Sequence, residues 1–322
     1  MTHYIGVDLG GTHLRAALVD TQHGAVVAME KVATPALQGP PAVEAAILGL
    51  VQAVIAQCAV PESELGGVGI GVPGLVDLDR GVALVVPNIP GDWSALPLEA
   101  DLQQALGLPV HLINDVRAIT LGEWTFGAGR GVDTLACYAI GTGIGGGVII
   151  NNRLHLGISG SAGEIGHQQV ELNGLACNCG GRGCLEMYAS GTAMAANAIK
   201  AVAQRRPTLI AALAGNDLNK ITLEIVVQAA LKGDAVAKEI FEQAGVYLGM
   251  AVANTLLTIS PRRVVFAGGA AAAGELLLDP VRRLVHARVH LVPVEKVEFV
   301  RATLGDEAGL LGAALWAQDR SQ

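Results

Sequence analysis

A strand–glycine turn–strand pattern occurs twice in this chain of 322 residues, at positions about 130 residues apart. The first copy turns at Gly10–Thr12 and the second at the glycine-rich run Gly141–Gly147. Short apolar runs bounded by turn residues are typical of strands, and the return of one unit predicts a duplicated, two-lobed architecture. The apolar runs lie at 4–7, 14–19 and 25–32 in the first copy, and at 134–140, 148–150 and 153–156 in the second.

Helices and further buried strands separate the two copies and follow the second, which predicts an α/β fold. Apolar residues at helical spacing and capping residues mark the helices, and short runs of Val, Ile and Leu mark the strands. The predicted helices are 41–58, 98–106, 116–126, 191–204, 222–231, 234–258 and 306–316, and the predicted strands are 68–72, 110–113 and 263–267.

Composition and charge exclude several classes of protein. Hydrophobic residues make up 51% of the chain and charged residues 16%, which excludes a disordered chain. The formal charge of −8 argues against nucleic acid as the main partner, because such surfaces need clustered Lys and Arg. The residues before Asp8 lack the basic segment of a signal peptide, and the apolar stretches 132–150 and 245–260 are broken by glycines or short for a bilayer. We therefore expect no membrane partner and a cytoplasmic protein.

The first glycine turn follows an acid at the end of a predicted strand, in the pattern Asp8-x-Gly10-Gly11-Thr12. The carboxylate can hold a magnesium ion or its waters, and the turn N–H groups and the threonine hydroxyl can contact phosphate oxygens. The same pattern also suits an ordinary hairpin, so alone it does not decide between the two.

The second turn contains Gly141-x-Gly143-x-x-Gly146, and Glu164 follows at about the distance expected for the ribose-binding acid of a dinucleotide site. We reject a dinucleotide site because that motif needs a helix after the turn, and here the apolar run 148–150 predicts a strand. What remains is a hairpin that either cradles phosphate oxygens or has no ligand. Two such turns, one in each half, favour a nucleoside triphosphate, and no P-loop sequence is present.

A histidine and three cysteines form the strongest local motif, His167-x9-Cys177-x-Cys179-x4-Cys184. Three thiolates and one imidazole make a closed tetrahedral zinc site of the structural type, because no position is left open for water. The alternative is three buried free cysteines.

Three acidic side chains outside the glycine turns have two interpretations each. Asp115 follows Asn114 directly before a predicted helix, so the pair is either a helix cap or contains a general base that takes a proton from a hydroxyl. From the residues alone the two are equal. Glu164 and Glu186 flank the cysteine loop, where they either accept hydrogen bonds from sugar hydroxyls or remain solvated acids.

Taken together, these motifs resemble those of the ROK family of bacterial sugar kinases, within the sugar kinase/actin-like ATPase superfamily, along nearly the whole chain. Few unrelated chains carry all six in this order. The motifs are Asp8-Leu9-Gly10-Gly11-Thr12 with Arg15, Asn114-Asp115, Ile140–Gly147, Gly163-Glu164-Ile165-Gly166-His167, Cys177-x-Cys179-Gly180-x-x-Gly183-Cys184-x-Glu186, and Phe266-Ala267-Gly268-Gly269.

The resemblance implies an RNase H-like fold of two α/β lobes with a structural zinc loop. A small lobe is expected at 1–115, completed by a C-terminal helix at 303–322, and a large lobe with the zinc loop and the adenosine site at 116–302. The implied reaction is ATP-dependent phosphorylation of a hexose at its 6-hydroxyl, with glucose as the expected sugar. The implied cofactors are ATP, Mg²⁺ and a structural Zn²⁺, and the implied assembly is a homodimer.

The resemblance also implies a role for each motif residue. Asp115 is expected to be the catalytic base. The sugar is expected to contact Asn88, Asn114, Glu164, His167 and Glu186. The nucleotide and its metal ion are expected at Asp8, Gly10, Gly11, Thr12, Thr142, Gly143, Gly268 and Gly269, and zinc at His167, Cys177, Cys179 and Cys184.

Two residues depart from the family pattern, and both lie on the nucleotide side. His13 stands where a lysine is common, and Ala270 stands where a third glycine is usual. They bear on the affinity for ATP rather than on the reaction.

The sugar itself has alternatives. Pro87-Asn88 and Trp93 resemble the glucokinase form of the sugar loop, which favours glucose. Kinases of N-acetylmannosamine, N-acetylglucosamine or fructose are the alternatives within the family, and a sugar-sensing ROK regulator without catalysis is the alternative outside the kinases. Asp115 argues against a regulator, and so does the short segment before Asp8, which leaves no room for a DNA-binding helix-turn-helix.

Overall fold

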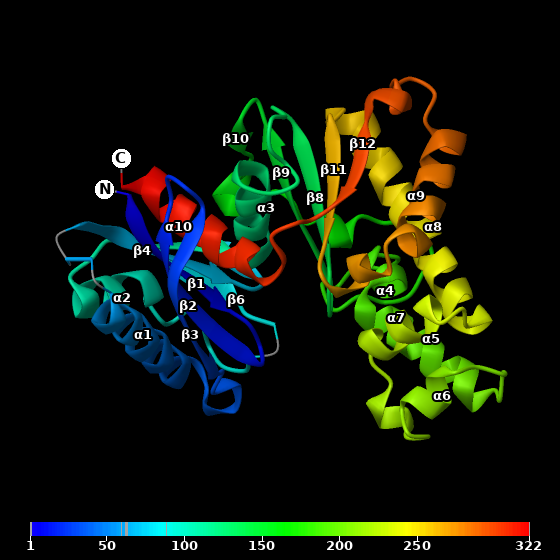
Figure 1. Ribbon diagram of the computed structural model, residues 1–322, viewed down its shortest axis with the longest axis horizontal. Coiled ribbons are helices and arrows are strands. Elements are labelled where there is room, and N and C mark those ends of the chain that lie inside the picture. The colour runs from blue at the N-terminus through cyan, green and yellow to red at the C-terminus, as the bar shows by residue number, and fades with distance from the viewer. Residues whose placement is uncertain (1, 59, 62–63, 88, 322) are drawn as a thin grey trace. The chain divides into compact units, whose positions relative to one another are not determined.

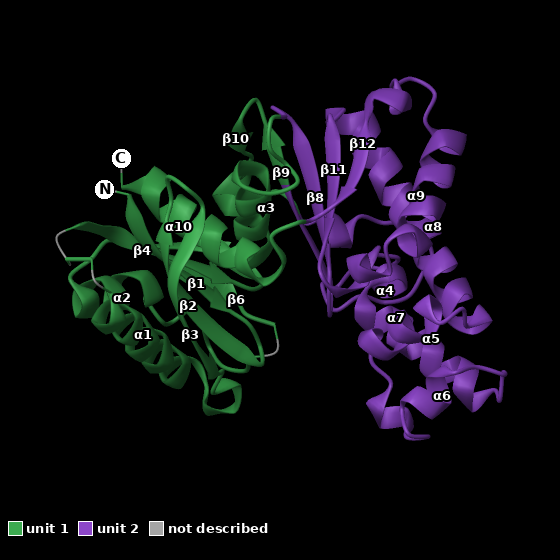
Figure 2. Cartoon of the chain, in the orientation of Figure 1, with its two compact units in different colours: residues 1–131, 148–163, 303–322 green, residues 132–147, 164–302 purple. Residues whose placement is uncertain are grey.

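The computed structural model describes residues 2–58, 60–61, 64–87 and 89–321 (Figure 1). They form two compact units: unit 1 comprises 1–131, 148–163 and 303–322, and unit 2 comprises 132–147 and 164–302 (Figure 2). The division based on sequence ended its first part at Asp115, whereas unit 1 continues to residue 131 and takes in 148–163. Unit 1 keeps the residues after Asp115 because α3 (Asp115–Thr125) packs along α10 (Ala308–Arg320).

A five-stranded sheet forms the centre of unit 1, in the order β3-β2-β1-β4-β7. β1, β2 and β3 are antiparallel neighbours, whereas β1, β4 and β7 run parallel. The three parallel strands therefore end at the same edge of the sheet. The strands are β1 (His3–Leu9), β2 (His13–Asp20), β3 (Ala25–Ala33), β4 (Leu65–Val72) and β7 (Val110–Asn114).

α1 (Pro40–Gln57) covers one face of this sheet, with α2 (Leu98–Leu106) beside it. Among the described residues, α1 is the one helix that is long and apolar enough to cross a membrane. Its buried side chains, which include Val43 and Ile47, instead pack in one cluster with Ile5 of β1. That is the packing of a helix that presents one apolar stripe to a sheet.

α10 covers the opposite face, and the contact is close because glycines face the helix. Side chains alternate between the two faces of a strand, so Gly6 of β1 lies on the side opposite Ile5. A Cβ on Gly6 would overlap the carbonyl of Leu310, and a Cβ on Gly69 of β4 would overlap the carbonyl of Ala313. The C-terminal helix thus lies directly against the first strand of the chain.

The second five-stranded sheet has the order β10-β9-β8-β11-β12. This order repeats that of the first sheet, with β8, β11 and β12 as the parallel strands, so the predicted duplication is confirmed in the strand order. The division between the units falls within β9, after Gly147. The strands are β8 (Leu135–Ile140), β9 (Ile144–Ile150), β10 (Arg153–Leu154), β11 (Arg263–Ala267) and β12 (Glu298–Arg301).

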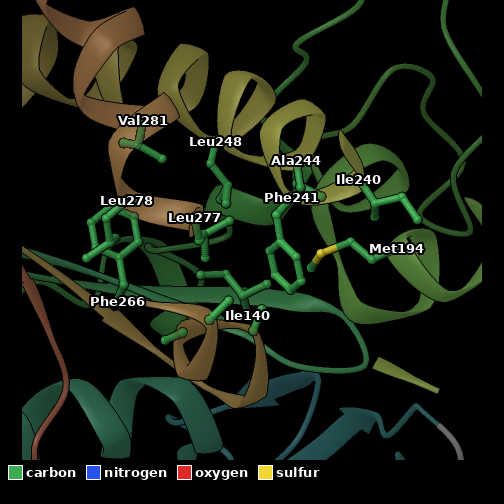
Figure 3. Close-up of a cluster of buried hydrophobic side chains, with 14 of the residues drawn as sticks. Ile140, Met194, Ile240, Phe241, Ala244, Leu248, Phe266, Leu277, Leu278 and Val281 are labelled. Carbon is green, nitrogen blue, oxygen red and sulfur yellow. The ribbon is translucent and has the colours of Figure 1, made fainter. Parts of the chain in front are cut away.

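The helices of unit 2 enclose a largely aliphatic core, as the aromatic content of 3% requires. Leu248 of α8 and Val281 of α9 contribute to it together with Ile140 of β8 and Phe266 of β11 (Figure 3). The helices are α4 (Glu186–Ala189), α5 (Gly191–Ala203), α6 (Ile210–Leu213), α7 (Leu223–Leu231), α8 (Ala235–Ile259) and α9 (Glu275–Arg288).

Several elements differ from the prediction. α9, β12 and the hairpin of β5 (Leu75–Asp77) and β6 (Val82–Val85) were not predicted. The prediction of a turn over the whole run 141–147 was wrong, because β9 already begins at Ile144. The glycines after Ile144 belong to β9, which pairs with β8, so the turn is limited to the first three residues of the run.

Candidate active site

Asp8 and Asp115 lie at the carboxyl-terminal edge of the parallel strands of unit 1. Asp8, near the end of β1, is in register with Gly71 of β4, and Gly71 is in register with Ile113 of β7. A Cβ placed on Gly71 would lie 3.6 Å from the Cα of Asp115. The sheet therefore brings two predicted site residues to the edge where open α/β sheets bind ligands.

Arg15 holds the carboxylate of Asp8. Its Nη2 and Nε donate to Asp8 Oδ2 at 2.6 and 3.2 Å, and its Nη1 lies 3.2 Å from Asp306 Oδ2. Asp8 and Arg15 face each other in the register of β1 and β2, so the strand pairing itself forms this ion pair.

The first glycine turn is closed by backbone bonds and by one threonine. Gly10 N–H donates to the carbonyl of His13 at 3.0 Å, and a Cβ on Gly10 would lie 2.8 Å from that oxygen. Thr34 Oγ1 donates to the Gly10 carbonyl at 2.7 Å, and Thr34 N–H donates to the Thr12 carbonyl at 3.0 Å. Gly11, Thr12 and His13 are exposed, so the tip of the turn faces solvent.

Asn114 is the cap of α3. Its Oδ1 accepts hydrogen bonds from the N–H groups of Val116 and Arg117 at 3.0 and 3.2 Å, and its Nδ2 donates to the carbonyl of Gly74 at 2.9 Å. Asp115 is the first residue of the helix and is half-buried, with its Oδ1 2.9 Å from the N–H of Val116. Asn114 is the residue that caps α3, and the N–H of Val116 is shared between Asn114 Oδ1 and Asp115 Oδ1.

The second glycine turn is held by the start of α5. Gly141 N–H donates to the carbonyl of Gly143 at 2.9 Å and closes the turn. Gly191 N–H donates to the Gly141 carbonyl at 2.8 Å, and Thr192 Oγ1 donates to the Thr142 carbonyl at 2.7 Å. The start of α5 thus holds the turn at two of its carbonyls, those of Gly141 and Thr142.

Glu186 holds the same turn from the side of α4. Its Oε2 accepts a hydrogen bond from the N–H of Ile144 at 2.8 Å, across 42 residues of sequence. A Cβ on Gly143 would overlap this carboxylate, so a side chain at position 143 would require the Glu186 side chain to move. Glu186, predicted as a sugar contact, therefore has a backbone partner at the start of β9, directly after the second glycine turn.

Gly268 and Gly269 lie at the same edge of the second sheet as the glycine turn. β11 ends at Ala267, which is in register with Ala139 of β8. Gly268 has φ +83°, and a Cβ there would overlap the backbone of Ile140, so only glycine fits. Ala270, in the place of a third glycine, is fully buried inside the fold.

His167, Cys177, Cys179 and Cys184 form a compact cluster, with all four ligand atoms within 4.8 Å of one another. His167 Nδ1 lies 3.6 Å from Cys177 Sγ, and Cys179 Sγ lies 3.6 Å from Cys184 Sγ. In a tetrahedral zinc site, neighbouring sulfur and nitrogen ligands are about 3.5–3.8 Å apart. All five cysteines of the chain are free thiols, and the cluster fits a zinc ion in chemistry and spacing.

The thiols of the cluster differ in pKa. Burial and the neighbouring thiols raise the pKa of Cys184 to about 12, whereas the backbone N–H of Gly181 and the neighbouring thiols lower the pKa of Cys179 against a smaller opposing effect of burial. Three thiolates this close repel one another, so a bound cation is what would let all three ionise.

Glu164 and His167 belong to one short segment. Glu164 is exposed and precedes a 3₁₀ turn at Ile165–His167, and the N–H of His167 donates to the Glu164 carbonyl at 3.1 Å. Gly166 lies so close to the carbonyl of Ile144 that a Cβ would overlap it. The glycine of this motif therefore serves packing against the start of β9.

Asn88, a predicted sugar contact, lies outside the described residues. Thr34, Gly74 and Thr192 were not predicted, although they fix the two turns and the Asn114 side chain from 24, 40 and 50 residues away. Hydroxyls and glycines are common in turns, so the sequence carries no signal that separates these three from the rest.

Residues 4–320 match the ROK family, and the chain belongs to that family. Its fold is that of the ROK sugar kinases, the actin-like ATPase fold. The chain is 35% identical over 312 residues to a glucokinase of Halalkalibacterium halodurans, covering 96% of this chain and 93% of that protein.

The chain is also similar to a solved structure of a ROK family glucokinase. The chain is 36% identical, with a TM-score of 0.86, to a ROK family glucokinase from Streptomyces griseus in complex with glucose and AMPPNP, covering 98% of this chain and 99% of that one. The chain is also 30% identical over 310 residues to the xylose repressor of Bacillus subtilis, covering 96% of this chain and 75% of the repressor.

Proposed function

We propose that this chain is a glucokinase, which transfers the γ-phosphoryl group of ATP to the 6-hydroxyl of glucose. Its relatives include glucokinases at 35–37% identity over nearly the whole chain. The Streptomyces griseus relative was crystallised with glucose and an ATP analogue.

The proposal rests on the different positions of Asn114 and Asp115 at the start of α3. Asn114 caps α3 and donates to Gly74, and Asp115 stands beside it at the sheet edge that also holds Asp8. A half-buried carboxylate next to the cap residue, at the strand edge where open α/β sheets bind ligands, is a candidate for proton transfer.

In the proposed reaction, Asp115 accepts the proton of the sugar 6-hydroxyl as that oxygen bonds to the γ-phosphorus. The bond between the γ-phosphorus and the bridging oxygen of the β-phosphate breaks, and ADP leaves. Phosphoryl transfer depends mainly on positioning and on neutralising charge. Mg²⁺, when bound with ATP, supplies part of that neutralisation.

The two glycine turns are proposed to bind the phosphate groups. Gly11, Thr12 and Thr142 are exposed and Gly143 is half-buried. The N–H groups of these four residues are proposed to contact phosphate oxygens. The other proposed nucleotide residues are Asp8, Gly10, Gly268 and Gly269.

The sugar hydroxyls are proposed to contact Asn88, Asn114, Glu164, His167 and Glu186. Zinc is proposed at His167, Cys177, Cys179 and Cys184, where it would hold His167 and the loop before Glu186 in place. The ring nitrogen of His167 that faces the cluster is Nδ1, so Nε2 is available to donate to a sugar hydroxyl.

The experiment is a coupled assay of ADP release across a panel of sugars. We expect kcat/KM for glucose to exceed the values for mannose, fructose, N-acetylglucosamine and N-acetylmannosamine. A site that hydrogen-bonds the 2-hydroxyl leaves polar groups unpaired when an acetamido sugar binds, at a cost of about 1–3 kcal/mol for each group. A higher value for either acetamido sugar would assign the chain to amino-sugar metabolism, and no turnover with any sugar would favour a regulator.

We propose that the enzyme works as a homodimer in the cytoplasm. Light scattering coupled to size-exclusion chromatography measures the mass in solution, and a mass of 33.0 kDa, that of a single chain, would contradict the dimer.

A further inference from the structure

Ile144, the first residue of β9 after the second glycine turn, is held on both its backbone groups by neighbours of the metal-ligand cluster. Its N–H donates to Glu186 Oε2 at 2.8 Å, and its carbonyl lies directly against Gly166. Glu186 follows Cys184 by two residues, and Gly166 immediately precedes His167. The two ends of the cysteine loop, residues 167–184, are therefore adjacent to residues that contact Ile144, directly after the turn.

These contacts constrain the orientation of the turn. The Gly143–Ile144 peptide donates its N–H to the Glu186 carboxylate in a charge-assisted hydrogen bond, and Gly143 lies close beside the same carboxylate. The N–H groups of Thr142 and Gly143 belong to the same three-residue turn, so their directions follow from that of the held peptide.

A second anchor of the same turn is independent of the cluster. Thr192 Oγ1 donates to the Thr142 carbonyl at 2.7 Å from the first turn of α5, which carries none of the four cluster residues. The turn therefore has a support from Glu186 next to the cluster and supports from Gly191 and Thr192 in α5. The Glu186 and Thr192 side chains can be removed separately.

We propose that Glu186 is a positioning residue that couples the cysteine–histidine cluster to the second glycine turn, so that metal occupancy sets the affinity for nucleotide. The coupling rests on the proposed function, in which this turn binds phosphate. When the cluster holds its ion, the loop after Cys184 is fixed and Glu186 keeps the turn in its binding shape. When the ion is lost, Glu186 loses its support and the turn relaxes.

The test compares Glu186→Ala, Glu186→Gln and the control Glu171→Ala in the full chain purified with its metal. Glu171 is an exposed acid between His167 and Cys177, so its loss removes the same charge without touching the turn. The readout is the Kd of AMPPNP with Mg²⁺ by calorimetry, without sugar, so that sugar contacts of Glu186 do not contribute. We expect Glu186→Ala to weaken binding about 10-fold, Glu186→Gln to weaken it less because one acceptor oxygen remains, and Glu171→Ala to leave it unchanged.

A second experiment removes the metal ion. Stripping the ion with a chelator is expected to weaken AMPPNP binding by wild type about as much as Glu186→Ala does, and to weaken the Glu186→Ala variant little further. Thr192→Val is the control variant, because its hydrogen bond to the turn comes from α5 and not from the metal loop. The losses of AMPPNP affinity caused by Thr192→Val and by the chelator should therefore be additive. Full additivity of the chelator with Glu186→Ala would overturn the coupling.

Hydrogen exchange of the backbone tests the same coupling with no ligand at all. Exchange in the peptide that spans 141–147 should accelerate in Glu186→Ala and in metal-free wild type, and stay unchanged in Glu171→Ala. Unchanged exchange in both of the first two samples would overturn the proposal. Failure of wild type to bind AMPPNP would instead refute the proposed kinase function, and the exchange measurement would still decide the coupling.

Discussion

Neighbouring residues at the start of α3 have different physical roles, although the sequence presents them as one motif. Asn114 is 8% exposed, and its side chain is used in three hydrogen bonds of the fold. Asp115 carries the charge. The residue types and their order made both positions candidates, but only the structure separates the cap from the acid.

Asp115→Asn is expected to lower kcat by about 10²–10⁴-fold while the fold and glucose binding persist. The amide keeps the size of the side chain but cannot accept the hydroxyl proton. Steady-state kinetics measures the loss, and the circular dichroism melting curve should match wild type because Asn114 still caps α3. A folded variant with near-normal turnover would show that Asp115 is not the base.

The Glu186–Ile144 contact marks the limit of residue-level prediction. The sequence showed Glu186 near the cysteines and Ile144 beside a glycine run, each with a function of its own. Nothing in either local pattern joins positions 42 residues apart, because the hydrogen bond exists only once α4 packs beside the turn.

At the scale of elements, periodicity predicted long helices and buried strands well and failed where tertiary contacts override local preference. α9 contains Pro280, which removes a backbone donor and normally ends a helix. Here Pro280 packs against Gly245 of α8, and the buried face of α9 maintains the helix through it. β12 is a short edge strand whose pairing with β11 is visible only in three dimensions.

α8 begins at a buried acid that makes its stability depend on pH. Asp234 is 7% exposed, and its carboxylate accepts bonds from the N–H groups of Ala237 and Leu209 and from the Thr208 hydroxyl. Burial alone would raise the pKa of Asp234, but these donors together outweigh it and lower the pKa below its ordinary value of 3.8. The ionised form is therefore stabilised by folding, and this contribution is lost as the pH falls through 3.8 towards the lowered value.

Asp234→Ala is expected to lower the free energy of unfolding at pH 7 by about 1–3 kcal/mol, because the cap and two further bonds are lost. Urea denaturation between pH 7 and pH 3 checks the linkage: the gap between wild type and variant should narrow as the pH falls. Asp234→Asn, which keeps an acceptor but does not titrate, serves as the control. A gap that stays constant with pH would contradict the lowered pKa.

We expect the cysteine loop, which holds the three cysteines of the cluster, to depend on a bound zinc ion for its structure. Cys179→Ser is expected to lower zinc content from one ion per chain and to lower the melting temperature, since a serine hydroxyl is a poor zinc ligand. Elemental analysis and calorimetry measure the two effects. Cys58→Ser is the matched control, because Cys58 lies in unit 1 and outside the cluster. Wild-type protein purified without chelator and free of zinc would contradict the site.

At the scale of the whole molecule, duplication explains why function could be inferred before any contact was known. Both sheets have the same strand order, and in each the predicted residues gather at the carboxyl-terminal edge of the parallel strands. The repeat of a strand–glycine turn–strand unit was enough to predict that symmetry. The duplication does not predict the helices that differ between the units, such as α8 and α9, because they are not part of the repeated pattern.

Ligand binding should stabilise the molecule in a way that reports both substrates. A ligand that binds only the folded chain raises the free energy of unfolding by RT ln(1 + [L]/Kd), about 2.7 kcal/mol at a concentration 100 times Kd. Glucose, and separately AMPPNP with Mg²⁺, are therefore each expected to raise the melting temperature by several degrees in a thermal-shift measurement. N-Acetylmannosamine at the same concentration as glucose should give a smaller shift, because the acetamido group leaves the partners of the 2-hydroxyl unpaired. Asp115→Asn should keep the glucose shift, since the base acts on a proton and not in binding. A shift with AMPPNP but with none of the hexoses would retain the nucleotide site and exclude glucose as the substrate.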